Sequence, residues 1–397
     1  MIEIGKNRKT RNTVIYFILI ISLLVGTVLL EYFGTTGAWT MMIICIKKSA
    51  VMALVAVSMN LLNGFTGLFS LGQAGFMLIG AYTYAIFTIP LAKRDTVYVY
   101  FDQVVNFSFP EVLGNFLGGF GMILGVLIAI MLAGLAAAGV AYLIGLPVLR
   151  LKSDYLAIAT LGFAEIIRAV FQWRKLGPLT NGANPLRNFV TLNSFKITLG
   201  GTTLKLGSFV VVLLAIVCIG VIVMLVNSSY GRAFKAIRED EIAAEAMGIN
   251  LYRHKQMAFC VSCFFAGVGG AMYAMFIDAA QANNFNAAMT YQILLMVVLG
   301  GIGSISGSCI GTVLFVFASE WWLRGLDSGT FLGINLPLVF RNGFRLVIIS
   351  IIIMSVILFF RRGLLGDKEL PYYMGRIKEW LQARFNRIKP KAGEQTG

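Results

Sequence analysis

The sequence is poor in charged residues. Lys, Arg, Asp and Glu make up 13% of its 397 residues, whereas apolar residues make up 58%; ordinary globular proteins contain roughly 25% charged residues. Six stretches of at least 18 residues carry no charged side chain: 13–30, 49–92, 112–149, 206–231, 256–277 and 279–319. Because a helix of about 20 apolar residues crosses the hydrocarbon core of a bilayer, this composition excludes an ordinary soluble domain and predicts a multi-pass membrane protein.

The residues that usually build catalytic or metal sites are also scarce. The one histidine, His254, lies beside Arg253 and Lys255, where a solvated flank explains it better than catalysis. All five cysteines lie in apolar segments, and the Cys260–Cys263 pair has no second pair nearby. There is no glycine-rich phosphate loop ending in Lys-Ser/Thr and no His partner for a nucleophile. We therefore expect no catalytic residue, no metal site and no cofactor bound by this chain.

The net charge of +15 has a topological explanation. A nucleic-acid partner would require a soluble basic domain with stacking aromatic residues, and the sequence has none. Lys and Arg instead collect on the cytoplasmic side of membrane proteins. With the N-terminus inside, the cytoplasmic segments hold 20 basic residues and the external loops hold 9. Both termini and the segment 228–255 are therefore predicted to be cytoplasmic.

The predicted fold is an all-α membrane bundle of about ten helices. Backbone groups must be paired in lipid, and the alternating pattern of a β-barrel is absent. The predicted spans are 13–31, 41–61, 69–91, 117–146, 153–173, 207–227, 256–278, 288–302, 305–322 and 343–361. This divides the chain into a basic cytoplasmic segment 1–12, a transmembrane domain 13–361 and a basic, amphipathic cytoplasmic tail 362–397.

One cytoplasmic segment is unusually dense in charge. Residues 231–248 read GRAFKAIREDEIAAEAMG and lie between two long apolar runs. A chain needs only a few polar residues to turn round at a membrane surface, whereas this segment forms helix and carries both signs of charge. It therefore predicts a docking surface for a soluble partner.

Glycine-rich segments are predicted at two inner turns. The first is interrupted by Gly64, Gly67, Gly72 and Gly75, each of which costs about 1 kcal/mol in a helix interior. Broken helices are tolerated in a membrane where they are buried or line a cavity, so these glycines either border a translocation path or allow close helix packing. Part of this pattern is repeated 236 positions later, which suggests an internal repeat. The matching pairs are Gly64 and Gly300, Gly67 and Gly303, Ser70 and Ser306, and Gly75 and Gly311.

Polar residues also mark the predicted span 153–173. Ser153 or Asp154 is placed to cap this helix, and Thr160, Glu165 and Arg168 follow along it. Ionisable groups at membrane depth usually face the bundle interior or a water-filled path. Because Glu165 and Arg168 are three residues apart, they either pair with each other or serve transport directly.

Together these segments resemble a known family. The carriers are NLLNGFTGLFSLGQAGFMLIGAY at 60–82, LRLKSDYLAIATLGFAEIIR at 149–168, TNGAN at 180–184, GRAFKAIREDEIAAEAMGI at 231–249 and MVVLGGIGSISGSCIG at 296–311. In this order they are similar to the M-type inner-membrane permease subunit of ATP-binding-cassette importers for branched-chain amino acids. The likeness covers residues 41 to 361.

The resemblance implies a coupling surface and a path. Permeases of this superfamily carry Glu-Ala-Ala, three residues and Gly in the loop that contacts the ATPases; here Ala243 and Ala244 precede Gly248, but Ile242 replaces Glu. The implied coupling residues are Arg232, Arg238, Glu239, Asp240, Glu241, Ala244 and Gly248. The expected path residues are Gly64, Gly67, Ser70, Gly72, Gln73, Asp154, Tyr155, Thr160, Glu165, Gly300 and Gly303.

The resemblance also implies partners. They are two ATPase subunits that carry ATP and magnesium, a related H-type permease subunit and an extracytoplasmic substrate-binding protein that docks on the external loops 92–116 and 174–206. The location implied is the cytoplasmic membrane of a bacterium. Two alternatives remain: a urea or short-chain amide permease of the same family, and an ion-coupled secondary transporter, for which Glu165 is the candidate ion relay.

Overall fold

The computed structural model describes residues 22, 24–31, 37–151, 153–199 and 202–322, with short pieces at 330–331, 334–335, 347–348, 350–351, 354–355 and 363–366. The predicted segment 1–12 and most of the predicted spans 13–31 and 343–361 lie outside the described residues, as does nearly all of the tail 362–397.

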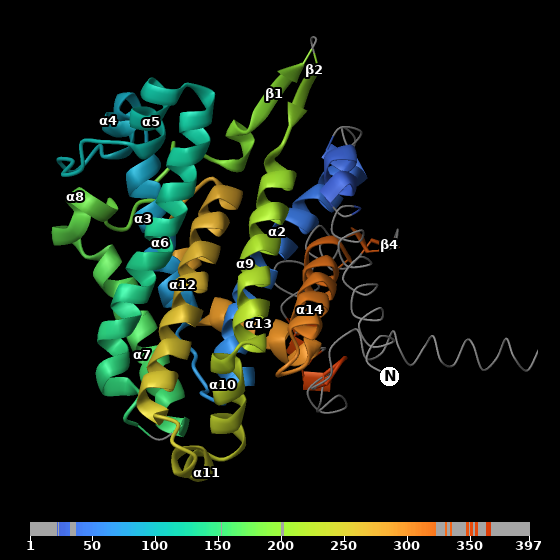
Figure 1. Ribbon diagram of the computed structural model, residues 1–397. Coiled ribbons are helices and arrows are strands. Elements are labelled where there is room, and N and C mark those ends of the chain that lie inside the picture. Colours follow the sequence, from blue (N-terminus) through green and yellow to red (C-terminus); the bar gives the residue numbers. More distant parts are fainter. Residues whose placement is uncertain are drawn as a thin grey trace, which may run out of the picture.

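The described part of the chain is a helical bundle, as predicted (Figure 1). Its long helices run roughly side by side, and each of the predicted spans between 41 and 322 coincides with one of them. They are α2 (Gly37–Asn60), α3 (Gln73–Thr88), α6 (Gly119–Val148), α7 (Ser153–Gln172), α9 (Gly207–Asn227), α12 (Leu251–Ile277), α13 (Ala287–Gly300) and α14 (Ile305–Phe317).

The described residues contain six helices that are long and apolar enough to cross a membrane, or seven if α3 and the bent segment Leu91–Val97 form one span. Helix α13 coincides with a predicted span but has only 14 residues. The total of ten stays a prediction, because the first and last predicted spans lie largely outside the described residues.

Small residues bring the central helices together. Helix α12 packs against α3 on one side and α6 on another. A Cβ atom at Gly80 of α3 would lie 2.0 Å from the carbonyl oxygen of Gly267 on α12, and one at Gly270 would lie 2.0 Å from the carbonyl oxygen of Met77. The helix backbones can approach this closely only because these positions lack side chains.

One end of the bundle carries short elements. Helices α4 (Arg94–Val97), α5 (Phe109–Leu117) and α8 (Gly177–Thr180) lie there, together with the hairpin of β1 (Lys196–Leu199) and β2 (Thr202–Lys205). A second small hairpin joins β3 (Thr330–Phe331) to β4 (Ile334–Asn335). These two hairpins were not predicted from the sequence, because they lie in the loops between the apolar runs.

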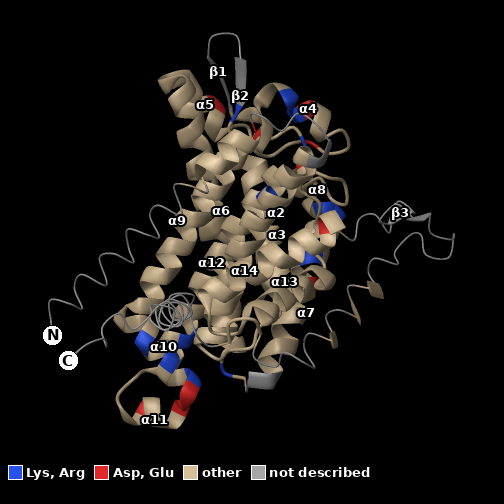
Figure 2. Ribbon diagram, turned by 90° about the vertical axis from the view of Figure 1, so that its right-hand side faces the viewer, with Lys and Arg blue, Asp and Glu red and all other residues tan. Residues whose placement is uncertain are grey.

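The opposite end carries the charge-dense segment. After α9 the chain forms α10 (Ser229–Glu239) and α11 (Glu241–Ala246) before it re-enters the bundle as α12 (Figure 1). Asp240 begins α11: its Oδ1 accepts hydrogen bonds from the backbone N–H groups of Ile242 at 2.8 Å and Ala243 at 3.0 Å. Basic residues lie along α10, and acidic residues lie at the junction of α10 with α11 and on α11 (Figure 2).

Candidate functional site

The predicted coupling segment is an exposed surface at the charged end of the bundle. Of its seven predicted residues, all except Ala244 are exposed, whereas Ala244 is 4% exposed and faces the bundle. Two large apolar side chains stand among the charges: Ile242 is 82% exposed and Met247 is 84% exposed. A polar surface with protruding apolar side chains has the composition of a protein-binding site.

This surface is rigidly attached to the bundle. Phe234 and Ile237 of α10 are buried beneath it. The Lys255 Nζ of α12 lies 2.6 Å from Glu241 Oε2, which ties α11 to the next long helix. A displacement of α10 and α11 therefore moves the ends of α9 and α12 with it.

Helix α10 also touches the first glycine-rich turn. The Arg238 Nη1 donates a hydrogen bond of 2.7 Å to the carbonyl oxygen of Gly64, and Lys235 Nζ lies 5.6 Å from the centre of the Phe65 ring. Gly64 and Phe65 belong to a single π-helical turn, Leu61–Phe65, at the end of α2. The sequence predicts Arg238 in the coupling surface and Gly64 in the translocation path. The structure brings these two residues into contact.

The two glycine-rich turns lie against each other. The Asn60 Oδ1 accepts a hydrogen bond of 2.9 Å from the N–H of Gly303, and its Nδ2 donates to the carbonyl oxygen of Ser304 and to Ser308 Oγ. Gly67 has φ +75° and Gly303 has φ +91°. The positive φ at two glycines separated by the repeat offset agrees with an internal repeat, which stays a prediction.

Several predicted path residues are packed inside the protein. Ser70, Gln73 and Thr160 are each at most 2% exposed. The Gln73 Nε2 donates to Ser58 Oγ at 2.8 Å, and Thr160 Oγ1 accepts from the N–H of Leu71 at 3.0 Å.

The neighbouring glycines are also packed against other protein atoms, which leave little room for a side chain. A Cβ at Gly72 would lie 3.0 Å from the carbonyl oxygen of Thr160, and one at Gly75 would lie 2.8 Å from Ala164 Cα. Around residues 70–75 the structure therefore favours close helix packing over direct lining of a path.

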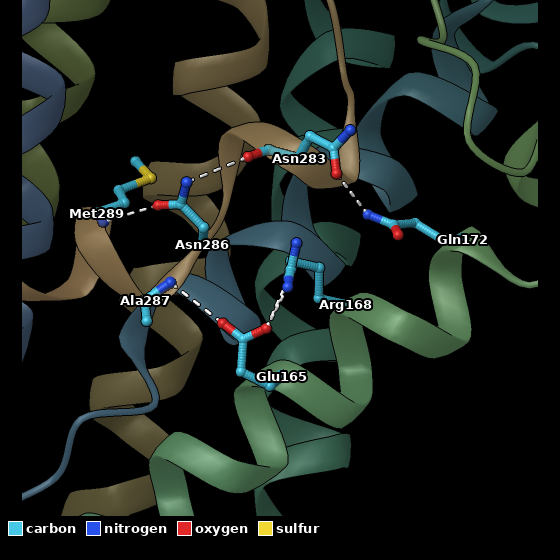
Figure 3. A network of polar contacts seen from close by, with 7 residues as sticks. All are labelled: Glu165, Arg168, Gln172, Asn283, Asn286, Ala287 and Met289. Atoms are coloured by element: carbon cyan, nitrogen blue, oxygen red, sulfur yellow. Dashed lines mark hydrogen bonds and ion pairs between the residues drawn. The ribbon is translucent and has the colours of Figure 1, made fainter. Parts of the chain in front are cut away.

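A polar network joins α7 to the start of α13 (Figure 3). The Glu165 Oε2 accepts from Arg168 Nε at 2.7 Å and lies 2.6 Å from Arg168 Nη2. The other oxygen, Oε1, accepts from the N–H of Ala287 at 3.2 Å. One turn further along α7, Gln172 Nε2 donates to Asn283 Oδ1 at 2.8 Å. The predicted pairing of Glu165 with Arg168 is present, and the pair also holds the first turn of α13.

This network remains accessible. The Arg168 side chain is 32% exposed and that of Glu165 is 36% exposed. Further exposed polar side chains continue the face along α13 and the turn before it: Asn283, Asn286, Tyr291 and Gln292. Tyr155 is exposed near the beginning of α7, whereas the Asp154 side chain lies outside the described residues. We call this surface the α7–α13 polar face.

At the other end, a buried arginine fixes the external loops. Arg94 is 1% exposed and donates to the carbonyl oxygens of Ile86, Ile89 and Phe107. This role could not be predicted from the sequence, because a basic residue in a loop between spans is ordinarily solvated. These hydrogen bonds hold the segment that follows α4 against the end of α3.

The TNGAN segment connects the two external loops. The Asn181 Nδ2 donates to the carbonyl oxygen of Val97 at 3.0 Å. The Tyr98 hydroxyl donates to the carbonyl oxygen of Leu179 at 3.0 Å, and burial raises the pKa of Tyr98 to about 12, which keeps this donor protonated at neutral pH. The loops 92–116 and 174–206 therefore form one connected surface.

Within the described residues, no group of three or more His, Cys, Asp or Glu side chains is arranged to hold a metal ion. The absence of an ATP-binding motif remains a sequence-based expectation.

Comparison with known proteins gives a consistent result. A family described as "Branched-chain amino acid transport system / permease component" matches residues 41–360. LivM of Salmonella typhimurium, a high-affinity branched-chain amino acid transport system permease protein, is 31% identical over 288 residues, which cover 67% of this chain and 60% of that protein. LivM of Escherichia coli K12 matches to the same extent.

LivH of Salmonella typhimurium, also a high-affinity branched-chain amino acid transport system permease protein, is 23% identical over 269 residues, covering 66% of this chain and 78% of LivH. The present chain thus spans about 60% of the length of the LivM proteins that it matches. No solved structure matches it.

Proposed function

Because the chain belongs to the branched-chain amino acid transport permease family, we propose that it is the transmembrane permease subunit of an ATP-binding-cassette importer for branched-chain amino acids. It is a multi-pass integral membrane protein. The observation that carries the proposal is the α10–α11 surface: it is exposed, charged and anchored between two long helices. An ATPase in the cytoplasm needs an exposed, firmly attached surface of this kind in order to move the membrane helices.

The proposed division of labour between subunits follows from the family to which the chain belongs. Two separate ATPase subunits bind and hydrolyse ATP and dock on residues 231–249. A related H-type permease completes the membrane unit; LivH, itself similar to this chain, carries the name of such a permease. An extracytoplasmic binding protein delivers the substrate to the connected external loops. The complex lies in the cytoplasmic membrane of a bacterium, and the permease itself is not an enzyme.

The proposed path runs along the α7–α13 polar face. Exposed polar and charged side chains at membrane depth are expensive in lipid, so they belong against water or another subunit. A path also has to bind its cargo weakly, since a tightly held substrate would not leave. A face with one compensated ion pair and a few amides meets that requirement.

An ion-driven mechanism is the less favoured alternative. An ion relay needs a carboxylate that can exchange its ion freely at mid-membrane. Glu165 is instead engaged by Arg168 and by the N–H of Ala287. A urea or amide substrate remains the runner-up within the same family, and uptake measurements with leucine, isoleucine, valine and urea distinguish these cargoes.

The central test replaces the acidic residues of the coupling surface. We expect Glu239→Ala, Asp240→Ala and Glu241→Ala together to abolish assembly with the ATPases or to leave ATP hydrolysis without leucine uptake. The change removes the α11 cap and the ion pair to Lys255. Uptake in proteoliposomes and co-purification of the ATPases are measured together.

A single Glu245→Ala variant is the matched control, because Glu245 is exposed on the same helix but is not one of the seven residues implied to make the contact. Normal uptake by the triple variant would refute the coupling role.

A further inference from the structure

The Glu165–Arg168 pair lies deep in the predicted membrane region. Glu165 is 12 residues along α7 from Ser153, which places it about 18 Å from the inner end of that helix at 1.5 Å per residue. Ala287, the first residue of α13, is 13 residues from Gly300 at the inner end of that helix, which places it about 20 Å from that end. Both distances fall inside a hydrocarbon core of about 30 Å.

The pair differs from a purely structural ion pair in the same bundle. Lys47 Nζ lies 2.8 Å from Glu31 Oε1, and these side chains are only 13% and 5% exposed. Arg168 and Glu165 are 32% and 36% exposed. An intramembrane pair that served stability alone gains from exclusion of water and of other ligands. The exposure of Arg168 and Glu165 leaves both side chains of this chain open to a ligand or to a neighbouring subunit.

The surroundings of the pair combine charge with an apolar surface. Two turns before Glu165, on the same face of α7, Ile158 is 69% exposed. Between them lies Gly162, which has no atom within 4 Å of the position that a Cβ would take. The face therefore presents one negative group, one positive group and an open aliphatic patch beside them.

We propose that this part of α7 is the contact site for the zwitterionic ends and aliphatic side chain of the amino acid in transit. This deepens the proposed function and rests on it. The Arg168 guanidinium receives the substrate carboxylate, Glu165 receives the ammonium group, and the substrate side chain lies over Gly162 and Ile158. When no substrate is present, the two protein charges compensate each other, and Glu165 also accepts the first N–H of α13.

The arrangement explains weak and selective passage. A net-neutral pair attracts a net-neutral zwitterion without leaving a bare charge in the membrane. Binding of the substrate breaks the ion pair between Glu165 and Arg168. The net free energy of substrate binding is therefore small, and the substrate is released readily. An uncharged cargo such as urea gains nothing from opening the pair.

The first test uses the complete importer, with both permeases, the ATPases and the binding protein, in proteoliposomes. Glu165→Gln and Arg168→Gln should each lower leucine uptake by about tenfold or more, the loss expected for one charge-assisted contact, while ATP hydrolysis stimulated by the binding protein stays within about twofold of wild type. Glu31→Gln and Lys47→Gln are matched controls that also break an intramembrane ion pair. Because breaking a buried pair also lowers stability, uptake is expressed per assembled complex. On that scale the two controls should lower uptake by less than about threefold.

The second test measures how accessible position 162 is to a reagent in water, and does not measure uptake. In the importer with its native cysteines replaced, Gly162→Cys should react with a membrane-impermeant charged thiosulfonate, and saturating leucine during ATP turnover should slow that reaction by about threefold or more, as occupancy of a site predicts. An unreactive cysteine would place Gly162 against lipid or a packed subunit and overturn the inference.

The outcomes separate the two proposals. Wild-type uptake of leucine driven by ATP, with unchanged uptake by both Glu165 and Arg168 variants, overturns the contact site and leaves the importer function intact. Failure of the wild-type complex to import leucine, with its subunits assembled, overturns the proposed function itself.

Discussion

Single residues at the inner end of the bundle decide how closely its two glycine-rich turns approach. A Cβ at Gly64 would lie 1.9 Å from Asn60 Oδ1 and 2.6 Å from the N–H nitrogen of Gly303. The Asn60 side chain fills the remaining space and satisfies the backbone of the second turn. Glycine at 64 is therefore required by a contact across the bundle, in addition to any local flexibility.

We predict that Gly64→Ala destabilises the protein. The added methyl group must displace Asn60 or Gly303, and overpacking of this kind costs about 1–3 kcal/mol. Gly139→Ala on α6 is the control, since nothing lies within 4 Å of its Cβ position; it should be neutral or stabilising by up to about 1 kcal/mol. Thermal unfolding of the purified protein in detergent measures both, and equal stability of the two variants would contradict the packing argument.

At the scale of elements, α10 is the link between the coupling surface and the interior. It rests on the bundle through buried Phe234 and Ile237 and reaches the π-helical turn through Arg238. The same turn is joined through Asn60 to the start of α14 and, a few residues later, through Leu71 to Thr160 of α7. Helix α10 is thus connected to α7 and α14 through these hydrogen bonds and the chain segment 60–71 that joins them.

We predict that Arg238→Gln uncouples the importer. The variant removes the charge-assisted donor to the Gly64 carbonyl, a contact worth about 1.5–3 kcal/mol. Leucine uptake should fall by about tenfold while ATP hydrolysis persists. Arg253→Gln, an exposed arginine at the start of α12, is the matched control and should transport like wild type. Tightly coupled transport by the Arg238 variant, with uptake per ATP unchanged, would rule out this route.

At the scale of the whole molecule, the charge distribution predicts the orientation. The charged helices α10 and α11 occupy one end (Figure 2), and the loops predicted to be external occupy the other (Figure 1). The rule that Lys and Arg collect inside predicts that α10 and α11 lie in the cytoplasm. Only in that orientation can an ATP-driven partner reach the coupling surface.

Cysteine labelling in intact cells tests this orientation. Met247 is 84% exposed at the end of α11, and Tyr100 is 78% exposed in the loop after α4. Tyr100→Cys should react with an impermeant maleimide from outside, whereas Met247→Cys should react only after the membrane is permeabilised. None of the native cysteines is fully exposed, which keeps the background low. Reaction of Met247→Cys from outside would invert the topology and exclude the proposed coupling.

The sequence alone was sufficient to predict the membrane class, the positions of the spans between 41 and 322 and the charged segment between α9 and α12. These features depend on runs of apolar residues and on local charge, which act separately in each segment of the chain. The sequence also offered the pairing of Glu165 with Arg168 as one of two interpretations, because residues three apart on a helix bring their side chains together.

The contacts between segments that are distant in the sequence are visible only in the folded bundle. The fold joins Asn60 to Gly303 and Arg238 to Gly64, buries Arg94 among carbonyl oxygens and sets the short α13 with its first N–H on Glu165. Such contacts link residues up to 243 positions apart. Helical periodicity describes the face of one helix and carries no information about its neighbour, so these partners emerge only when the helices pack.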